Sequence, residues 1–267
     1  MHNAHAMVLA AGRGERMRPL TDRTPKPLLA VQGQALLDWH VRALARGGFD
    51  KLVVNTAWLG EHIQPHLAPL AAELGVQLSC SHEGQDFGRA LETAGGIYRA
   101  LPQLGEVFWV VAGDVFMPDF QFTRAALERF AASPQLAHLW LVANPAHNPG
   151  GDFGLSPDGL ALNLPAGHPD RRWTFSTLAL YKRAFFSRPD SPAPPGNPQG
   201  LACALAPLLR AAMDRGEVSA QEHAGAWTDV GTPERLAQLN GAASAQPLPA
   251  DFLADRQDAP PQECDWR

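Results

Sequence analysis

Cysteine is scarce in this sequence, and the few cysteines are not spaced for cross-links or metal sites. The three cysteines among 267 residues, Cys80, Cys203 and Cys264, are odd in number and far apart. None has the C-x-x-C spacing that thiolate metal sites use. The sequence therefore argues against a disulfide framework and against a cysteine-based zinc site, and this pattern favours a protein of the cytosol.

The sequence also lacks a long basic run and a long apolar run near its start. Its 22 basic and 27 acidic residues give a formal net charge of −5, which argues against bulk binding of nucleic acid. The first apolar run, residues 6–11, is soon followed by Arg13, Arg16 and Arg18. It is too short for the core of a signal peptide or for a membrane span. We therefore expect a cytoplasmic protein with no nucleic-acid or membrane partner.

The sequence does contain enough apolar residues for a large core. Hydrophobic residues make up 45% of the chain, which is too many for a mainly disordered protein. Strand-like and helix-like patterns alternate over the first 145 residues. This alternation predicts an α/β fold with a Rossmann-like, mostly parallel sheet covered by helices on both faces. The expected strands are 6–11, 52–55, 76–81, 108–112 and 138–143, and the expected helices are 36–46, 59–72, 94–101 and 122–132.

The pattern changes after residue 150. Short strand-like segments are separated there by Gly/Pro turns, which predicts a small mixed β excursion from the main sheet. We expect one domain over 1–242 and a C-terminal tail over 243–267 that is rich in Pro, Gln and Asp. The later strands are expected near 152–155, 159–163, 173–181, 217–221 and 226–230, and the later helices at 205–213 and 233–239.

The most informative segment is LAAGRGERMRPLTDRTPKPL, residues 9–28. Gly12 and Gly14 follow a predicted strand, where glycine lets the backbone turn sharply and approach a phosphate. The segment has no G-K-[ST] and so is not a Walker A loop. Met17 stands where a dinucleotide-binding loop has its third glycine, which disfavours a nicotinamide-dependent dehydrogenase. Arg16 and Lys26 add positive charge, and the prolines on both sides of Lys26 stiffen its backbone. We therefore expect a loop that binds phosphate groups.

Two aspartates form the second signal. Asp114 follows the predicted strand 108–112, and Asp229 lies at the end of another predicted strand. Open α/β sheets bind ligands beyond the carboxyl ends of their strands. Mg²⁺ that accompanies a nucleoside triphosphate is held by one or two carboxylates together with the phosphates. Each aspartate is therefore either a magnesium ligand or a turn or helix-capping residue.

With these motifs the chain resembles the sugar-1-phosphate nucleotidyltransferases, whose signature is L-A-A-G-x-G-x-R followed by P-L-T and P-K-P. The resemblance covers roughly residues 5–240. It is greatest to a subgroup of short members that use UTP and N-acetylmuramic acid 1-phosphate in peptidoglycan recycling. The further runs that resemble this subgroup are NTAWLG at 55–60, LETAGG at 91–96, NPAH at 144–147, GDF at 151–153 and WTDVGT at 227–232.

The resemblance implies an enzyme that binds a nucleoside triphosphate and a sugar 1-phosphate, with Mg²⁺ as its cofactor. We expect an NTP-binding half of about 1–118 and a sugar-binding half of about 119–242, which contains the β excursion. By resemblance, Arg16 and Lys26 are catalytic, and Asp114 and Asp229 bind the metal ion. The nucleotide-binding residues implied are Ala11, Gly12, Gly14, Glu83, Gln85, Thr93 and Gly95. The sugar-binding residues implied are Asn144, Asp152, Gly154 and Ser176.

The identity of the base and of the sugar stays open at the level of sequence. Either Glu83 or Gln85 is expected to read the base edge, and only Gln can both donate and accept a hydrogen bond. The chain lacks the Glu-Lys-Pro segment with which many relatives bind sugar hydroxyls, which weakens a glucose- or mannose-type assignment. The alternatives are a glucose-1-phosphate thymidylyltransferase, a mannose-1-phosphate guanylyltransferase and a non-catalytic module that senses sugar nucleotides. The expected assembly is a monomer or a small homo-oligomer.

Overall fold

A nine-stranded sheet forms the centre of the computed structural model, which describes residues 5–241. The first strand, β1 (His5–Leu9), lies between β4 (Lys51–Thr56) and β6 (Val107–Ala112) and runs parallel to both. On the far side of β4, β5 (Gln77–His82) adds a further parallel strand. On the far side of β6, β11 (Arg172–Lys182) runs antiparallel. The four parallel strands were all expected from the sequence.

The second half of the sheet is built around β11. Its other edge pairs antiparallel with β8 (Ala137–Val142), and β12 (Val218–Glu222) pairs parallel with β8. Both strands therefore run in the direction of β6, and β11 alone is reversed among these seven strands. The short strands β9 (Phe153–Leu155) and β10 (Ala161–Leu162) extend the sheet from the first residues of β11. The mostly parallel sheet and its mixed β excursion are thus confirmed.

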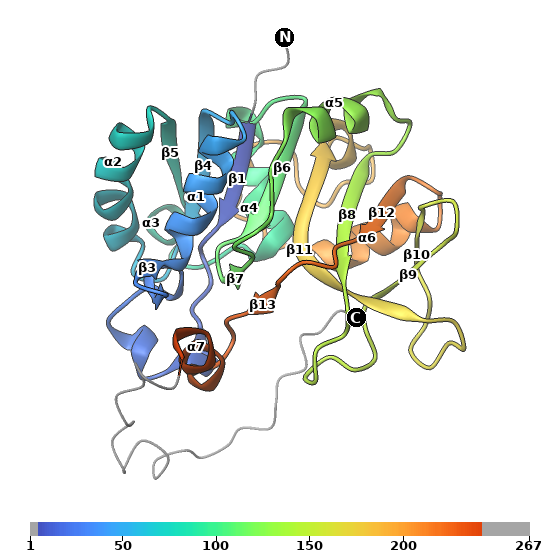
Figure 1. Ribbon diagram of the computed structural model, residues 1–267. Helices are drawn as coiled ribbons and strands as arrows, with labels where there is room; N and C mark the ends of the chain where they lie inside the picture. The colour runs from blue at the N-terminus through green and yellow to red at the C-terminus, as the bar shows by residue number, and fades with distance from the viewer. Residues whose placement is uncertain (1–4, 242–267) are drawn as a thin grey trace.

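Helices cover both faces of the sheet (Figure 1). One face packs against α1 (Leu36–Arg46), α2 (Ile63–Leu74) and α5 (Arg124–Ala132), and the other against α4 (Glu92–Ala100) and α6 (Leu205–Met213). Because successive strand residues point to opposite faces, neighbours on β6 enter different clusters. The bounds of α1 and α6 agree with those expected from the spacing of apolar residues.

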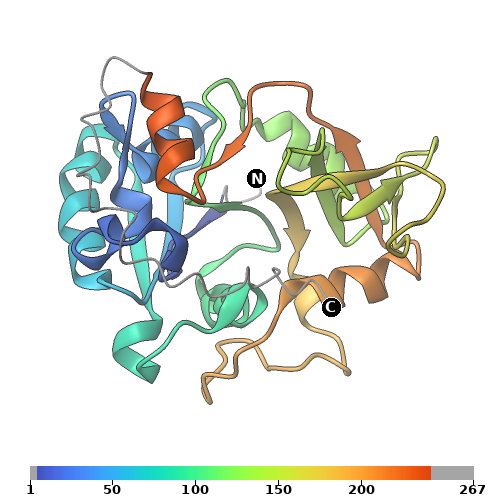
Figure 2. The same ribbon diagram turned by 90° about the horizontal axis from the view of Figure 1, so that it is seen from below.

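The C-terminal part of the described chain returns to the N-terminal loop (Figures 1 and 2). There β13 (Thr228–Asp229) pairs antiparallel with β7 (Val115–Phe116). The following helix, α7 (Pro233–Asn240), packs on a small apolar cluster that includes Met17 and Val230. This return places the WTDVGT run beside the phosphate loop, which the order of elements alone does not predict.

Three features of the fold differ from the sequence-based expectations. The short helix α3 (Glu83–Phe87) is not among the expected elements. The helix expected at 94–101 begins two residues earlier, so that Glu92–Gly96 of the LETAGG run lie within α4. A small hairpin of β2 (Ala30–Val31) and β3 (Gln34–Ala35) is also not among the expected elements. Short elements are missed because one or two turns have too few residues to show a period. The tail 243–267 lies outside the described residues.

Within residues 5–241, no helix is both long and apolar enough to cross a bilayer.

Replacing Trp109 tests how much the apolar cluster between the sheet and α1, α2 and α5 contributes to stability. Its ring is fully buried and lies 4.8 Å from Trp140 and 5.1 Å from Phe122, centroid to centroid. We expect Trp109→Ala to lower the free energy of unfolding by about 3–5 kcal/mol, because it leaves a large cavity. Trp109→Phe should cost clearly less, since it keeps a ring and removes an Nε1–H that has no partner among the described residues. Urea unfolding measures both, and equal losses would contradict this account.

Candidate active site

Lys26 is held inside the protein at the end of the phosphate loop. Its side chain is 10% exposed, and its Nζ lies 2.5 Å from Oδ2 of Asp114. Gly14 packs on the stem of this lysine with a φ of +68°, and a Cβ there would lie 3.2 Å from Cβ of Lys26 and 3.0 Å from Cγ2 of Thr21. A side chain at position 14 would therefore have a strained backbone conformation and would crowd Lys26 and Thr21.

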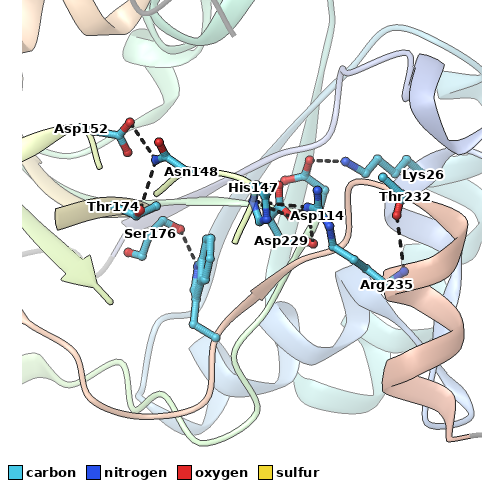
Figure 3. Close-up of polar contacts among 11 residues, drawn as sticks. Lys26, Asp114, His147, Asn148, Asp152, Thr174, Ser176, Asp229, Thr232 and Arg235 are labelled. Atoms are coloured by element: carbon cyan, nitrogen blue, oxygen red, sulfur yellow. Dashed lines mark hydrogen bonds and ion pairs between the residues drawn. The ribbon is translucent and has the colours of Figure 1, made fainter. Parts of the chain in front are cut away.

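The two predicted metal ligands lie side by side. Asp229 faces Val115 across the β7–β13 ladder, and the N–H of Val230 donates to the carbonyl of Asp114 at 2.8 Å. Asp114 follows the carboxyl end of the central strand β6, as expected for a ligand site in an open sheet. The tertiary fold thus brings together two acids that are far apart in the sequence (Figure 3).

The environment of Asp114 keeps its carboxylate charged. Burial acts to raise the pKa of Asp114, but the charge and hydrogen bond of Lys26 outweigh it and hold the pKa below its ordinary value. The side chain is still 39% exposed, so a ligand can reach it. An ionised, accessible carboxylate is what a metal ligand requires.

Two arginines and a histidine lie near Asp229, the second predicted metal ligand. A Cβ on Gly231 would lie 3.0 Å from Nη1 of Arg235, 3.3 Å from Nη2 of Arg16 and 3.2 Å from Oδ2 of Asp229. Arg235 also forms an ion pair with Asp229, and His147 Nε2 lies 3.5 Å from Oδ1 of Asp229. Burial, together with the charges of Arg235 and Arg16, lowers the pKa of His147. The site therefore holds the predicted Arg16 next to an arginine from α7.

Sequence reasoning missed Arg235 and His147. Arg235 follows the WTDVGT run by three residues, and its backbone N–H is capped by the Thr232 hydroxyl at 3.4 Å. A cation just after a metal-binding motif is a weak signal that could have been noted. His147 ends the NPAH run, but only the fold shows that it reaches Asp229.

Glu83 has a structural environment. It is fully buried, its Oε1 accepts from Asn55 Nδ2 at 2.7 Å, and its Oε2 accepts from the Leu91 N–H at 2.7 Å. Asn55 in turn accepts from the N–H of Ala10 at 2.8 Å. Burial raises the pKa of Glu83, and the hydrogen bonds oppose this shift. Both carboxylate oxygens of Glu83 have protein partners. Of the two residues expected to read the base, only Gln85 is exposed.

The other residues expected to bind nucleotide differ in their surroundings. Gly12 is exposed, and a Cβ there would meet nothing within 4 Å, whereas Ala11 is buried. Gly95 packs on the segment before α6, because a Cβ would lie 2.6 Å from the carbonyl oxygen of Leu201. Its lack of a side chain is thus explained by packing. Thr93 lines a pocket described below. The nucleotide roles of these residues stay predictions.

The four residues expected to bind sugar are all engaged within the protein. Asp152 accepts from the Phe175 N–H at 2.8 Å, and Ser176 donates to the Trp140 carbonyl at 2.7 Å. Asn144 donates to the Arg172 carbonyl at 3.0 Å, and a Cβ on Gly154 would lie 2.5 Å from Leu164. These contacts link the segments around β8, β9 and β11, and Asp152 and Ser176 lie to the left of the charged cluster in Figure 3. A direct role toward the sugar stays a prediction for all four.

A pocket of about 310 Å³ opens near the carboxyl ends of two central strands. It lies against the last residues of β1 and β6, Leu9 and Ala112, and Ala112 is two residues before Asp114. Glu92 and Thr93 of α4 and Thr177 of β11 supply polar groups to an otherwise mainly apolar lining. Ligand pockets commonly combine apolar walls with a few placed polar groups.

Comparison with known proteins decides the family. The model of the nucleotidyl transferase family matches residues 5–156, which include the phosphate loop and Asp114. The chain belongs to the nucleotidyl transferase family. It is 46% identical over 243 residues to the N-acetylmuramate alpha-1-phosphate uridylyltransferase of Neisseria meningitidis serogroup B, covering 90% of this chain and 98% of that protein.

A second relative supports the same family, and a solved structure shows the fold. The N-acetylmuramate alpha-1-phosphate uridylyltransferase of Caulobacter vibrioides is 33% identical over 242 residues, covering 86% of this chain and 92% of that protein. A solved structure described as a glucose-1-phosphate thymidylyltransferase from Bacillus anthracis matches with a TM-score of 0.72 and 21% identity, covering 93% of this chain and 99% of that one. The match to this solved structure confirms the fold. The protein is a nucleotidyltransferase, and enzymes of this family use a nucleotide and a sugar 1-phosphate.

The donor set of this nucleotidyltransferase fits a divalent metal ion that arrives with its substrate. No group of three or more His, Cys, Asp or Glu side chains within residues 5–241 is arranged to hold an ion alone. The adjacent carboxylates of Asp114 and Asp229 instead offer hard oxygen ligands from two residues. Mg²⁺ is typically bound in this way, with substrate phosphates and water completing its shell.

The role of Glu83 can be tested through stability. We expect Glu83→Gln to lower the free energy of unfolding by about 1–3 kcal/mol, because the new NH₂ group would face a buried donor. Gln85→Ala in the same short helix should change it by less than about 0.5 kcal/mol, since Gln85 is exposed. Urea unfolding gives both values. A fully stable Glu83→Gln protein that binds nucleotide more weakly would instead support contact with the base.

Proposed function

We propose that this nucleotidyltransferase transfers the uridylyl group of UTP to N-acetylmuramic acid 1-phosphate, releasing pyrophosphate, in peptidoglycan recycling. The reaction type rests on one observation: Lys26 of the signature loop meets Asp114, which is hydrogen-bonded to the strand that carries Asp229. The substrates are supported by relatives that are 46% and 33% identical and are named for N-acetylmuramate 1-phosphate.

The transfer needs charge neutralisation more than proton transfer. An oxygen of the sugar phosphate bonds to the α-phosphorus of UTP, while the bond from that phosphorus to the bridging oxygen breaks and pyrophosphate leaves with the electron pair. The attacking oxygen is already an anion, so no general base is required. Bringing two polyanions together is the main barrier, and fixed cations lower it.

The cations of the site suit this task. Lys26 is buried on a stiff segment between Pro25 and Pro27, so its charge stays in one place during the reaction. We assign it to the phosphate oxygens that must approach each other. Arg16 lies on the exposed loop before it, and we assign it to the departing pyrophosphate. Arg235, beside Arg16 at Gly231, adds a third positive charge on the same side.

We further propose Mg²⁺ as the cofactor, with Asp114 and Asp229 as its protein ligands. When bound, the ion would neutralise and orient the α-phosphate. Lys26 holds Oδ2 of Asp114, and Arg235 and His147 contact the carboxylate of Asp229, so both acids are oriented by neighbouring side chains. Such support of ligand residues by a second layer of side chains is usual for metal sites.

The wider organisation is also a proposal. The phosphate loop, Lys26 and Asp114 fall within an NTP-binding half of about 1–118, and the excursion of β9 and β10 falls within a sugar-binding half of about 119–242. We propose that this one domain acts in the cytoplasm as a monomer or small homo-oligomer and needs no macromolecular partner.

A substrate panel tests the proposed reaction. Pyrophosphate release is measured with each of four nucleoside triphosphates and with N-acetylmuramic acid, glucose and mannose 1-phosphates. We expect the highest kcat/KM for UTP with N-acetylmuramic acid 1-phosphate, and we expect EDTA to abolish release until Mg²⁺ is added. Preference for dTTP with glucose 1-phosphate would replace the proposed substrates. Silence with every pair would favour a binding module.

Removing the central ion pair tests the mechanism. Lys26→Ala and Asp114→Asn should each lower kcat by about 10²-fold or more, because each removes a charge that acts on the transition state. Lys51→Ala is the matched control. Lys51 is the first residue of β4 and so lies at the amino ends of the parallel strands, whereas Asp114 follows the carboxyl end of β6. It should keep wild-type turnover. Thermal unfolding confirms that all three proteins fold, and near-normal turnover of the first two would exclude this mechanism.

A further inference from the structure

The NTAWLG run at 55–60 ends the strand β4 in a tight turn. Thr56 is the last residue of β4, and Leu59 has a φ of +50°, in the left-handed region that non-glycine residues rarely adopt. A Cβ on Gly60 would lie 2.9 Å from Cβ of Thr56, so the turn is closely packed. This turn carries Trp58, which is 36% exposed and takes no part in the transfer described above.

The side chain of Trp58 makes two contacts with the phosphate loop. Its Nε1–H donates to the carbonyl oxygen of Thr21 at 2.8 Å, and the guanidinium of Arg13 lies 3.6 Å from the centroid of its ring. Nη1 of Arg13 donates to the same Thr21 carbonyl at 3.0 Å. Each of the three residues therefore contacts the other two. We call this set, Arg13, Thr21 and Trp58, the Trp58 clamp.

Arg13 directs its donors to the loop itself. Its Nη2 donates to Oδ1 of Asp22 at 2.9 Å, and its side chain is 25% exposed. The hydrogen bond from Arg13 holds the pKa of Asp22 below its ordinary value, so this carboxylate stays charged at neutral pH. A guanidinium that stacks on an aromatic face and donates in its own plane has a well-defined position. Arg13 is thus fixed before any substrate binds.

The Trp58 clamp continues into the residues that act on phosphate. Thr21 is fully buried, and its hydroxyl donates to the carbonyl of Gly14 at 2.9 Å. Gly14 in turn packs between Cγ2 of Thr21 and the stem of Lys26. Arg16 follows two residues later, in the short 3-10 turn Glu15–Met17. A displacement of Thr21 would therefore be passed on to both cations of the loop.

The phosphate loop has little regular structure of its own. Between residues 12 and 24 it contains two short 3-10 turns, Glu15–Met17 and Leu20–Asp22, and it belongs to no strand of the sheets. Single 3-10 turns are weakly held, so contacts from outside must set the shape of such a segment. Met17 supplies one anchor, in the apolar cluster that it shares with Val230. The Trp58 clamp supplies another, from the turn after β4.

We propose that Trp58 is a positioning residue for nucleotidyl transfer. Through Arg13 and Thr21 it holds the phosphate loop in the conformation that binds the triphosphate, with both cations of the loop in place. The inference rests on the proposed function, which assigns these cations to phosphate groups. Apparent affinity falls with the fraction of protein that has the binding conformation. A loop that is already in that conformation therefore lowers KM for the nucleoside triphosphate without any contact between Trp58 and the substrate.

The kinetic test compares variants of the two stacked side chains. We expect Trp58→Ala and Arg13→Ala each to raise KM for UTP about tenfold, as when the binding conformation falls to about a tenth of the population. The change in kcat should be less than about threefold, since bound triphosphate restores the loop. Trp58→Phe keeps a ring under Arg13 but loses the Nε1–H donor, so its KM should lie between those of the wild type and Trp58→Ala.

The double variant shows whether the two side chains act together. If both work through the Trp58 clamp, Trp58→Ala combined with Arg13→Ala should raise KM for UTP no further than either change alone. Additive effects, with Arg13→Ala much the larger, would assign Arg13 to direct phosphate binding and overturn the proposal. Arg171→Ala is the matched control, because Arg171 lies 3.4 Å from the ring centroid of Trp173, outside the loop. It should leave KM for UTP unchanged.

Hydrogen exchange of the ligand-free protein tests the Trp58 clamp apart from turnover. Backbone amides of residues 12–22 should exchange faster in Trp58→Ala and Arg13→Ala than in the wild type and in Arg171→Ala, since the loop opens more often. Equal exchange in Trp58→Ala and the wild type overturns the proposal, and so does an unchanged KM for UTP.

Failure of the proposed reaction is distinguished by the same proteins. If the wild type releases no pyrophosphate with any substrate pair, calorimetric titration with UTP and Mg²⁺ replaces KM. Faster exchange together with UTP binding that is about tenfold weaker in Trp58→Ala then supports the Trp58 clamp, and only the proposed reaction fails. A lowered melting temperature with unchanged UTP binding would assign Trp58 to stability alone and overturn the proposal.

Discussion

The contact between Lys26 and Asp114 is the interaction on which the rest of the site depends. It joins the N-terminal loop to the end of the central strand β6 over a distance of 2.5 Å. The same aspartate also accepts the Val230 N–H through its backbone, which attaches the C-terminal segment. The phosphate loop, the central strand β6 and the segment that follows Asp229 therefore all meet at Asp114. A buried lysine paired with a carboxylate avoids the high cost of an isolated buried charge.

A second layer of polar contacts fixes the parts of the site relative to one another. Glu83 links Asn55 at the end of β4 to the start of α4, and Asn55 continues the connection to Ala10 at the start of the phosphate loop. On the other side, Asp152 and Ser176 hold β9, β8 and β11 together. Glu83, Asp152 and Ser176 were candidate ligand contacts in the sequence. Their burial and hydrogen bonds give each of them a structural role that chemical type and position in the sequence do not reveal.

At Glu92 and Thr177 the backbone has a positive φ, and the buried Tyr181 hydroxyl has no hydrogen-bond partner among the described residues. All three residues line one pocket. Proteins tolerate such features where they serve binding or catalysis.

The α/β alternation, the phosphate loop with Arg16 and Lys26, and the family could be predicted from the sequence, because they follow from local periods and short motifs. Most elements were also placed to within a few residues by the spacing of apolar side chains. The folded structure was needed to show that Asp229 lies beside Asp114, that Arg235 and His147 contact Asp229, and that both carboxylate oxygens of Glu83 have protein partners. Those outcomes depend on strand pairing between distant segments. The positive φ angles of Glu92 and Thr177 were likewise not predictable, because neither residue type favours that conformation.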